Sequence, residues 1–268
     1  YHQIKIVEFT GYLASILIGI SLGLIGGGGS ILTVPVLVYL FAVDTVLATT
    51  YSLFVVGSTS LVGSFSYFKK GLIDLKTAIY FGVPSIVTVF LTRHFLLPTI
   101  PKKVIYIDNF LLTRSILLMV IFAVLMVFAA YVMIKKDKEN DATLPENTTL
   151  SVIIQGAAVG IVTGLIGAGG GFLIIPALVN LLKLPMKTAI GTSLIIIALN
   201  SLVGFGFSLD HYPIQWTFLL TVTLIAIVGI FIGTYLSTKI EGKKLKPAFG
   251  WFVLVMGIYI LIKETILK

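Results

Sequence analysis

The chain has 268 residues, of which 57% are hydrophobic and only 11% charged, and its formal net charge is +8. Soluble domains carry about 25% charged residues, so a water-soluble surface is excluded. The absence of cysteine excludes a disulfide scaffold and thiolate chemistry. Long apolar runs separate the charged residues, as in a polytopic membrane protein, and lysines in membrane loops explain the basic balance better than nucleic-acid binding does.

In chain order, eight uncharged runs approach or exceed the roughly 20 residues that a spanning helix needs. The first and the fifth are too long for a single helix, and glycine clusters interrupt both. We therefore predict an all-α polytopic membrane protein. The runs are Phe9–Val43, Thr45–Phe68, Thr77–Thr92 (continuing past Arg93 to Pro98), Ser115–Ile134, Asn147–Leu182, Thr188–Leu209, Pro213–Thr238 and Pro247–Ile262.

Each glycine cluster should divide its run into two helical pieces, because glycine runs break helices and permit positive φ. The predicted pieces are Phe9–Ile25 with Ile31–Val43, and Leu150–Ile166 with Phe172–Leu182. The piece Ile31–Val43 covers about 20 Å, which is less than the roughly 30 Å hydrocarbon core. The glycine turns should then lie within the membrane, and Pro35 and Pro176 should lie one turn into the second pieces.

The two halves of the chain repeat each other at one constant offset, without gaps. Gly23–Pro35 aligns with Gly164–Pro176, and Ser60–Gly63 aligns with Ser201–Gly204. We therefore divide the chain into a first transmembrane repeat (1–134), a polar cytoplasmic linker (135–149) and a second repeat (150–268). Such duplication is characteristic of transporters.

The positions of the basic residues predict how the two repeats are oriented. If each broken run is a hairpin that returns to its own side, each repeat has three further full spans and the repeats are inverted. This arrangement places 12 of the 19 lysines and arginines on the side of the linker, whereas a parallel arrangement places only nine on one side. The positive-inside rule therefore favours inverted repeats with a cytoplasmic linker.

A glycine turn that leads into a helix can bind an anion without charged side chains, because the first N–H groups of a helix are free and carry partial positive charge. The alternative is that the glycines only allow close helix packing. Hydroxyls on the second spans could add donors, or could instead bond to their own backbone. The predicted substrate-binding residues are Gly26, Gly27, Gly28, Gly29, Ser30, Thr50, Ser52, Gly167, Gly169, Gly170, Gly171, Thr192, Ser193 and Asn200.

Other features favour structural roles. Arg93 could attract an anion at the mouth, but we expect it to snorkel to the interface. Gly229-x-x-x-Gly233 predicts helix packing, and Val104–Ser115 could lie along the interface. No carboxylate falls inside a predicted span, so a buried proton or sodium relay is not evident. We predict no enzyme activity, no cofactor and no metal site; the sequence does not indicate the oligomeric state.

The glycine motifs resemble those of the TauE/SafE sulfite exporter family. Gly164–Pro176 followed by Ala189-Ile190-Gly191-Thr192-Ser193 is the better copy, and the first copy departs from the pattern at Ala48-Thr49-Thr50-Tyr51-Ser52. The resemblance implies a multi-pass permease of the inner membrane that exports sulfite or an organosulfonate, with the lipid bilayer and a small anion as its partners. A transporter of another small anion, or a cation or metal permease, remains the alternative.

Overall fold

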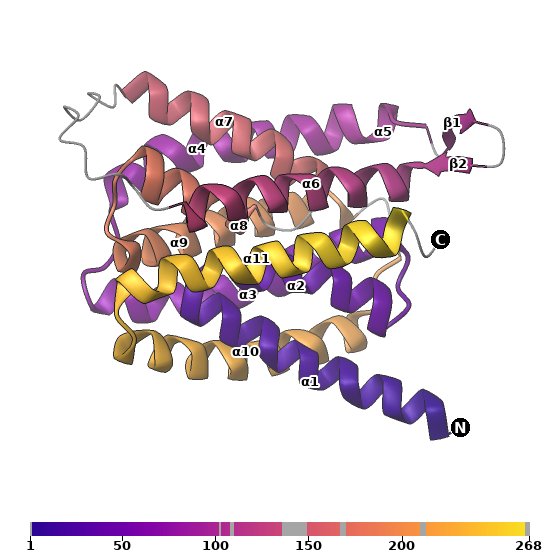
Figure 1. Cartoon of the computed structure of the whole chain (residues 1–268), viewed down its shortest axis with the longest axis horizontal. Coiled ribbons are helices and arrows are strands. Elements are labelled where there is room, and N and C mark those ends of the chain that lie inside the picture. Colours follow the sequence, from indigo (N-terminus) through magenta and orange to yellow (C-terminus); the bar gives the residue numbers. More distant parts are fainter. Residues whose placement is uncertain are drawn as a thin grey trace.

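The computed structural model describes residues 2–101, 103–107, 110–135, 149–166, 170–209 and 213–265. The long helices lie along one common direction, which is horizontal in Figure 1. The first half comprises α1 (His2–Ile25), α2 (Gly28–Pro35), the π-helix η1 (Val36–Leu40), α3 (Thr45–Lys69), α4 (Leu75–Leu91), η2 (Thr92–Leu96), α5 (Leu97–Thr99), β1 (Lys103–Ile107), β2 (Phe110–Thr113) and α6 (Arg114–Ile134). The second comprises α7 (Thr149–Ile166), α8 (Gly171–Pro176), η3 (Ala177–Leu181), α9 (Met186–Gly206), α10 (Trp216–Lys239) and α11 (Gly242–Thr265).

Seven of the described helices are long and apolar enough to cross a membrane, which confirms the predicted helical membrane fold. They are α3, α6, α7, α9, α10, α11 and the continuous segment from α4 into η2. Large apolar side chains face outward along them; Phe65, Phe128 and Val255 are each more than 60% exposed. In a membrane this outer surface contacts lipid tails and needs no polar cover.

The two broken runs fold as predicted up to the glycines and differ after them. The second pieces start at Gly28 and Gly171, earlier than the predicted starts at Ile31 and Phe172, because the last glycines of each cluster already belong to the helix. Pro35 and Pro176 therefore end α2 and α8 rather than lying in their first turns. A π-helix follows each proline directly. Because proline has no N–H to donate, the backbone hydrogen-bond ladder can shift its spacing there.

The backbone repeats these irregular features at the offset found in the sequence. The two π-helices begin at matching positions of the repeat, Val36 and Ala177. Each is followed by a non-glycine residue with positive φ, Ala42 at 52° and Lys183 at 58°, and these two residues match at the same offset. Helices α3 and α9, and likewise α4 and α10, also start at matching positions.

The segment Val104–Ser115, which we expected along the interface, includes strands that an all-helical prediction does not contain. Strands β1 and β2 pair antiparallel there, with Lys103 opposite Thr113 and Ile107 opposite Phe110. The hairpin joins α5 to α6 at one end of the bundle (Figure 1). The predicted linker, 135–149, lies outside the described residues except for Lys135 and Thr149.

Helices from the two halves pair across the molecule. Helix α1 packs against α10, and α7 packs against α4, while α3 packs against α9 and α6 against α11. Glycines make the first two interfaces close: Gly19 lies against the backbone of Ala226, and Gly160 lies against the backbone of Ser85. Gly229 and Gly233 lie against the α1 backbone at Ile16 and Ile20, which confirms the predicted packing role of this Gly-x-x-x-Gly motif.

Corresponding elements of the two halves run in opposite directions in Figure 1. Helix α1 starts at the right-hand end of the bundle, whereas α7 starts at the left-hand end. Helices α3 and α9 are also antiparallel to each other, because Gly57 lies against Leu202 while Gly204 lies against Leu53.

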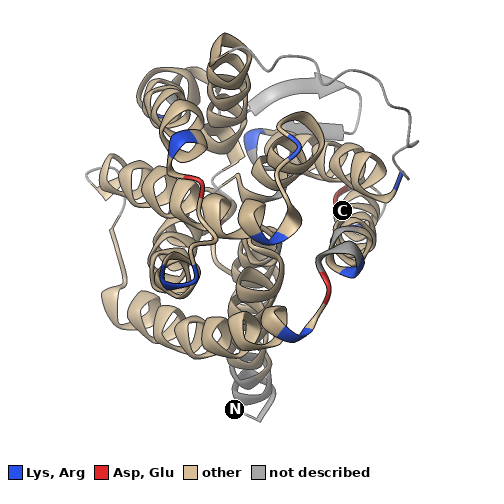
Figure 2. Cartoon of the chain, turned by 90° about the vertical axis from the view of Figure 1, so that its left-hand side faces the viewer, with Lys and Arg blue, Asp and Glu red and all other residues tan. Residues whose placement is uncertain are grey.

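Basic residues mark the end of the bundle that carries the linker. Figure 2 views that end directly and shows Lys and Arg at helix ends and loops. Three helices finish there with a lysine whose Nζ lies over an aromatic ring four residues earlier, at 4.5 Å for Lys69 and Phe65 and 4.7 Å for Lys239 and Tyr235; the third pair is Lys135 and Tyr131. A cation at a helix C-terminus offsets the helix dipole, and an aromatic ring beside it suits the membrane interface.

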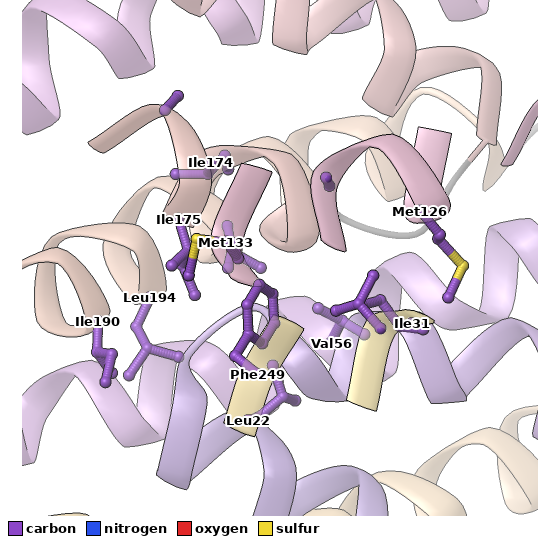
Figure 3. Close-up of a cluster of buried hydrophobic side chains, with 14 of the residues drawn as sticks. Leu22, Ile31, Val56, Met126, Met133, Ile174, Ile175, Ile190, Leu194 and Phe249 are labelled. Carbon is purple, nitrogen blue, oxygen red and sulfur yellow. The ribbon is translucent and has the colours of Figure 1, made fainter. Parts of the chain in front are cut away.

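The core lies where α2 of the first half meets α8 of the second half. Figure 3 shows its apolar side chains converging from α1, α2, α3, α6, α8, α9 and α11. Leu22, Ile31 and Phe249 are fully buried in it. The core therefore holds the two glycine turns in a fixed relation to α3 and α9.

Candidate functional site

The two glycine turns touch each other inside the bundle. A Cβ added to Gly27 would overlap the Gly171 carbonyl group and lie 2.7 Å from the Gly171 Cα. A Cβ added to Gly171 would in turn lie 2.5 Å from the Gly27 Cα. The backbones of Gly27 and Gly171 approach as closely as glycine alone permits, as close helix packing requires. Residues 167–169, including the predicted Gly167 and Gly169, lie outside the described residues.

Both turns use glycine in the left-handed region of backbone conformation. Gly26 has φ +76° and precedes α2, and Gly170 has φ +67° and precedes α8. The residues that cap these helices, Gly27 and Gly170, contribute no side-chain hydrogen bond. Helix starts of this kind leave backbone N–H groups available for water or for an anion.

Two serines adjoin the contact between the turns. The hydroxyl of Ser193 lies 2.8 Å from the position that a Gly26 Cβ would occupy, and the Ser30 hydroxyl lies 3.2 Å from that of a Gly171 Cβ. Ser30 donates to the Gly27 carbonyl at 2.6 Å. The structure thus brings together Gly26, Gly27, Ser30, Gly171 and Ser193 from the predicted set. Gly28 and Gly29 follow in the first turn of α2.

Three of the predicted hydroxyls, including that of Ser193, donate to carbonyl groups of their own helices. Ser52 donates to the Thr49 carbonyl at 3.0 Å, and Ser193 to the Ile190 carbonyl at 2.9 Å. Thr50 donates to the Val46 carbonyl at 3.3 Å. Such bonds to the helix backbone are the alternative to substrate binding that the sequence leaves open. They reduce the number of hydroxyl donors available to a substrate.

Thr192 fixes the start of a neighbouring helix. Its hydroxyl accepts the N–H of Asp74 at 2.9 Å, directly before α4. The Tyr51 hydroxyl accepts the N–H of Gln215 at 2.8 Å, directly before α10, and these two residues are the repeat counterparts of Thr192 and Asp74. The first bond joins α9 to the start of α4, and the second joins α3 to the start of α10. Each bond therefore connects the two halves of the chain.

A buried polar layer lies on α3 and α9, and only one of its residues was predicted as a site residue. It consists of Thr59, Ser60, Asn200 and Ser201, all with 0% exposure. Asn200 donates from Nδ2 to the Ser85 hydroxyl at 2.6 Å. Its Oδ1 and the three hydroxyl oxygens have no hydrogen-bond partner among the described residues. The sequence contains a signal for this layer, because both repeats have polar residues at the same two matching positions, 59 and 200 and 60 and 201.

The prediction that Arg93 snorkels to the interface is wrong. Its side chain is only 7% exposed and donates from Nη1 to the Ser208 hydroxyl at 2.9 Å. The π-helix η2 continues α4 at this point, and the arginine packs against Gly204 of α9. A buried guanidinium therefore lies near the end of the bundle opposite the linker.

One carboxylate falls inside a span, contrary to the sequence prediction. Helix α11 continues past the predicted end at Ile262 to Thr265 and so includes Glu264, which is 1% exposed. Its Oε1 accepts the Tyr39 hydroxyl at 2.6 Å, and the Lys263 Nζ lies 3.7 Å from the Tyr39 ring centroid. This cluster joins α11 to η1. Within the described ranges, no group of three or more His, Asp or Glu residues could hold a metal ion.

Comparison with known proteins gives one family. The family model described as Sulfite exporter TauE/SafE matches residues 12–260, which include both hairpins and the polar layer. No solved structure matches.

The similar curated proteins cover nearly the whole chain. A "Probable membrane transporter protein" of Xylella fastidiosa is 28% identical over 91% of this chain and 91% of its own length. Proteins with the same description from Bacillus subtilis and Methanocaldococcus jannaschii are 27% and 28% identical, over 93% of this chain and 98% and 94% of their own lengths. These names specify membrane transport and do not specify a substrate.

Proposed function

Because the chain belongs to the sulfite exporter TauE/SafE family, we propose that it exports a small sulfur-containing anion, sulfite or an organosulfonate, across the cytoplasmic membrane. The chain is a multi-pass membrane protein of a transporter family.

The contact between the two glycine turns is the observation that carries the proposal. It joins the two halves of the chain inside the bundle, where Gly26 lies beside Ser193 and Gly171 beside Ser30. Helix starts that are capped only by glycine supply N–H donors, and serine hydroxyls can add to them. An anion bound there would be held without lysine or arginine.

The two halves would act as inverted repeats in alternating access. The opposite directions of α1 and α7, and the pairing of each with a helix of the other half, support this proposal. Rocking of one half against the other would separate the glycine turns and open the site to each side in turn.

Export has a sufficient driving force without a proton relay. A cell interior that is negative by 100 mV favours the exit of each negative charge by about 2.3 kcal/mol. With the basic end of the bundle in the cytoplasm, as the positive-inside rule favours, substrate would enter there and leave past the end that carries Arg93.

The test is flux measured with purified protein in proteoliposomes. Vesicles loaded with sulfite or methanesulfonate are given an inside-negative potential, and vesicles loaded with a divalent metal ion are given an inside-positive one. Release is compared with that from protein-free vesicles under the same potential. The proposal expects release of sulfite or the sulfonate that rises with the potential. Release of the metal ion alone would favour the metal-permease alternative and contradict an anion exporter.

A further inference from the structure

We infer that the substrate anion is held by the polar layer of Thr59, Ser60, Asn200 and Ser201, and that this layer accepts singly charged oxyanions in preference to doubly charged ones. The inference rests on the proposed function and makes it more specific. It moves the main ligand contacts from the glycine backbone to four neutral side chains on α3 and α9, and it sets the charge of the substrate.

Hydrogen bonding distinguishes this layer from the other hydroxyls of the same helices. Thr49 and Ser64 on α3, and Ser193 on α9, each donate to the carbonyl three residues earlier. The layer has equal access to helical carbonyls, yet one oxygen of each of its four residues is buried without a partner in the described part of the chain. A buried polar atom without a partner is costly, so four of them indicate a ligand that supplies the missing bonds.

The layer lies at one level along α3 and α9. Gly57 lies against Leu202 and Gly63 against Leu194, so the antiparallel register places Thr59 opposite Asn200. Ser60 and Ser201 are the next residues along each helix. All four therefore lie within about one helical turn of each other, on opposite sides of the α3–α9 contact.

The glycine turns pack against one face of α9, and that face also carries Ser201 of the polar layer. Ser193, Ile197 and Ser201 are spaced by four residues and so share one face of α9. Ser193 lies at Gly26, and the Ile197 Cδ1 lies 2.6 Å from where a Gly171 Cβ would be. Ser201 is one turn further along the same face.

The donors of the layer are neutral, which determines the substrate charge that it can accept. Flipping the Asn200 amide, so that its oxygen and nitrogen exchange places, lets Ser85 donate to Oδ1 and frees Nδ2, and the layer can then offer three hydroxyls and one amide. The sequence has no lysine or arginine between Thr45 and Phe68 or between Thr188 and Leu209. The cost of dehydrating an ion grows with the square of its charge, so neutral donors can offset it far better for one charge than for two.

The experiment measures sulfite release from proteoliposomes at mildly acidic pH, where most sulfite is hydrogensulfite. Thr59→Val and Asn200→Leu remove polar groups at similar volume, and Ser64→Ala is the matched control because the Ser64 hydroxyl is already bonded to its own helix. Each layer variant should lower the rate at limiting sulfite about tenfold or more, since a hydrogen bond to a charged group contributes about 1.5–3 kcal/mol. Thr59→Ser, which keeps the hydroxyl, should retain transport.

Thermal unfolding separates a ligand contact from a structural role. Because the Thr59 hydroxyl has no partner among the described residues, Thr59→Val should unfold at the wild-type temperature or above it while transport falls. Asn200→Leu also removes the bond to Ser85, so it should unfold at a lower temperature as well as lose transport. Methanesulfonate, with one charge, should compete with sulfite, and sulfate, with two, should compete at least tenfold more weakly.

The outcomes separate the two claims. Wild-type release of sulfite with equal release by Thr59→Val and Asn200→Leu would overturn the polar layer and leave the proposed function in place. Sulfate competing as well as methanesulfonate would overturn the charge preference. A wild-type protein that releases neither sulfite nor methanesulfonate would overturn the proposed function, and with it this inference.

Discussion

Replacing Gly27 with alanine tests how the two glycine turns are held together. An added Cβ would overlap the Gly171 carbonyl and lie 2.7 Å from its Cα, whereas carbon atoms pack at about 3.5 Å or more. The two turns would have to separate by about 1 Å, and neither backbone can rotate out of the way as a side chain would. Overpacking of this kind costs about 1–3 kcal/mol, and we expect the upper part of that range.

The reciprocal substitution, Gly171→Ala, acts on the same contact and gives a sharper test. Once one Cβ has separated the turns, the second finds the space already opened, so the double variant should be only slightly less stable than either single variant. Gly82→Ala is the control, because its Cβ would meet only Ile196, at an ordinary 3.6 Å, and alanine favours the helix.

The assay is thermal unfolding in detergent together with sulfite release from proteoliposomes. Gly27→Ala and Gly171→Ala should each lower the unfolding temperature, by about 2–4 °C per kcal/mol for a domain of 150–250 residues, and should reduce release. Wild-type unfolding and wild-type release by Gly27→Ala would refute the contact between the turns. Additive losses in the double variant would refute a single shared contact.

Three further predictions concern helix starts and the cluster at Glu264. Asp44→Ala should lower the free energy of unfolding by about 1 kcal/mol, because its carboxylate accepts the N–H groups of Val46 and Leu47 at the start of α3; an unchanged melt would contradict this cap. Thr192→Val should cost about 1 kcal/mol through the Asp74 N–H and leave the KM for sulfite unchanged, whereas a raised KM at full stability would indicate substrate contact. Tyr39→Phe should cost about 1–3 kcal/mol by removing a donor from buried Glu264, and Glu264→Gln in the Tyr39→Phe background should restore part of it; chemical unfolding that is unaffected by Tyr39→Phe would contradict the role of this bond.

The sequence was sufficient to predict where the helices break and which proteins the chain resembles. Apolar runs report on membrane helices directly because lipid tolerates few other structures, and glycine clusters interrupt helices wherever they occur. The interruptions at Gly26 and before Gly170 are therefore local properties of the chain. The π-helices after Pro35 and Pro176 were missed, since a proline shows that a hydrogen bond is lost and does not show how the ladder adjusts.

The functional side chains were harder to predict, because their roles depend on partners that are distant in sequence. Ser52 and Ser60 are both serines on α3, yet the first donates to its own helix and the second has no partner among the described residues. Thr192 has the residue type and repeat position of a substrate ligand, but its hydroxyl oxygen accepts the backbone N–H of Asp74, a residue far away in the sequence. The sequence does not place Glu264 in a span, because α11 continues three residues beyond the apolar run that ends at Ile262.

The most direct measurement is potential-driven release of sulfite from proteoliposomes that contain either the wild-type chain or the Thr59→Val/Asn200→Leu variant. The proposed mechanism predicts release by the wild type that increases with an inside-negative potential, and release by the folded variant that falls at least tenfold toward the level of protein-free vesicles. Wild-type release no faster than that of protein-free vesicles would contradict it.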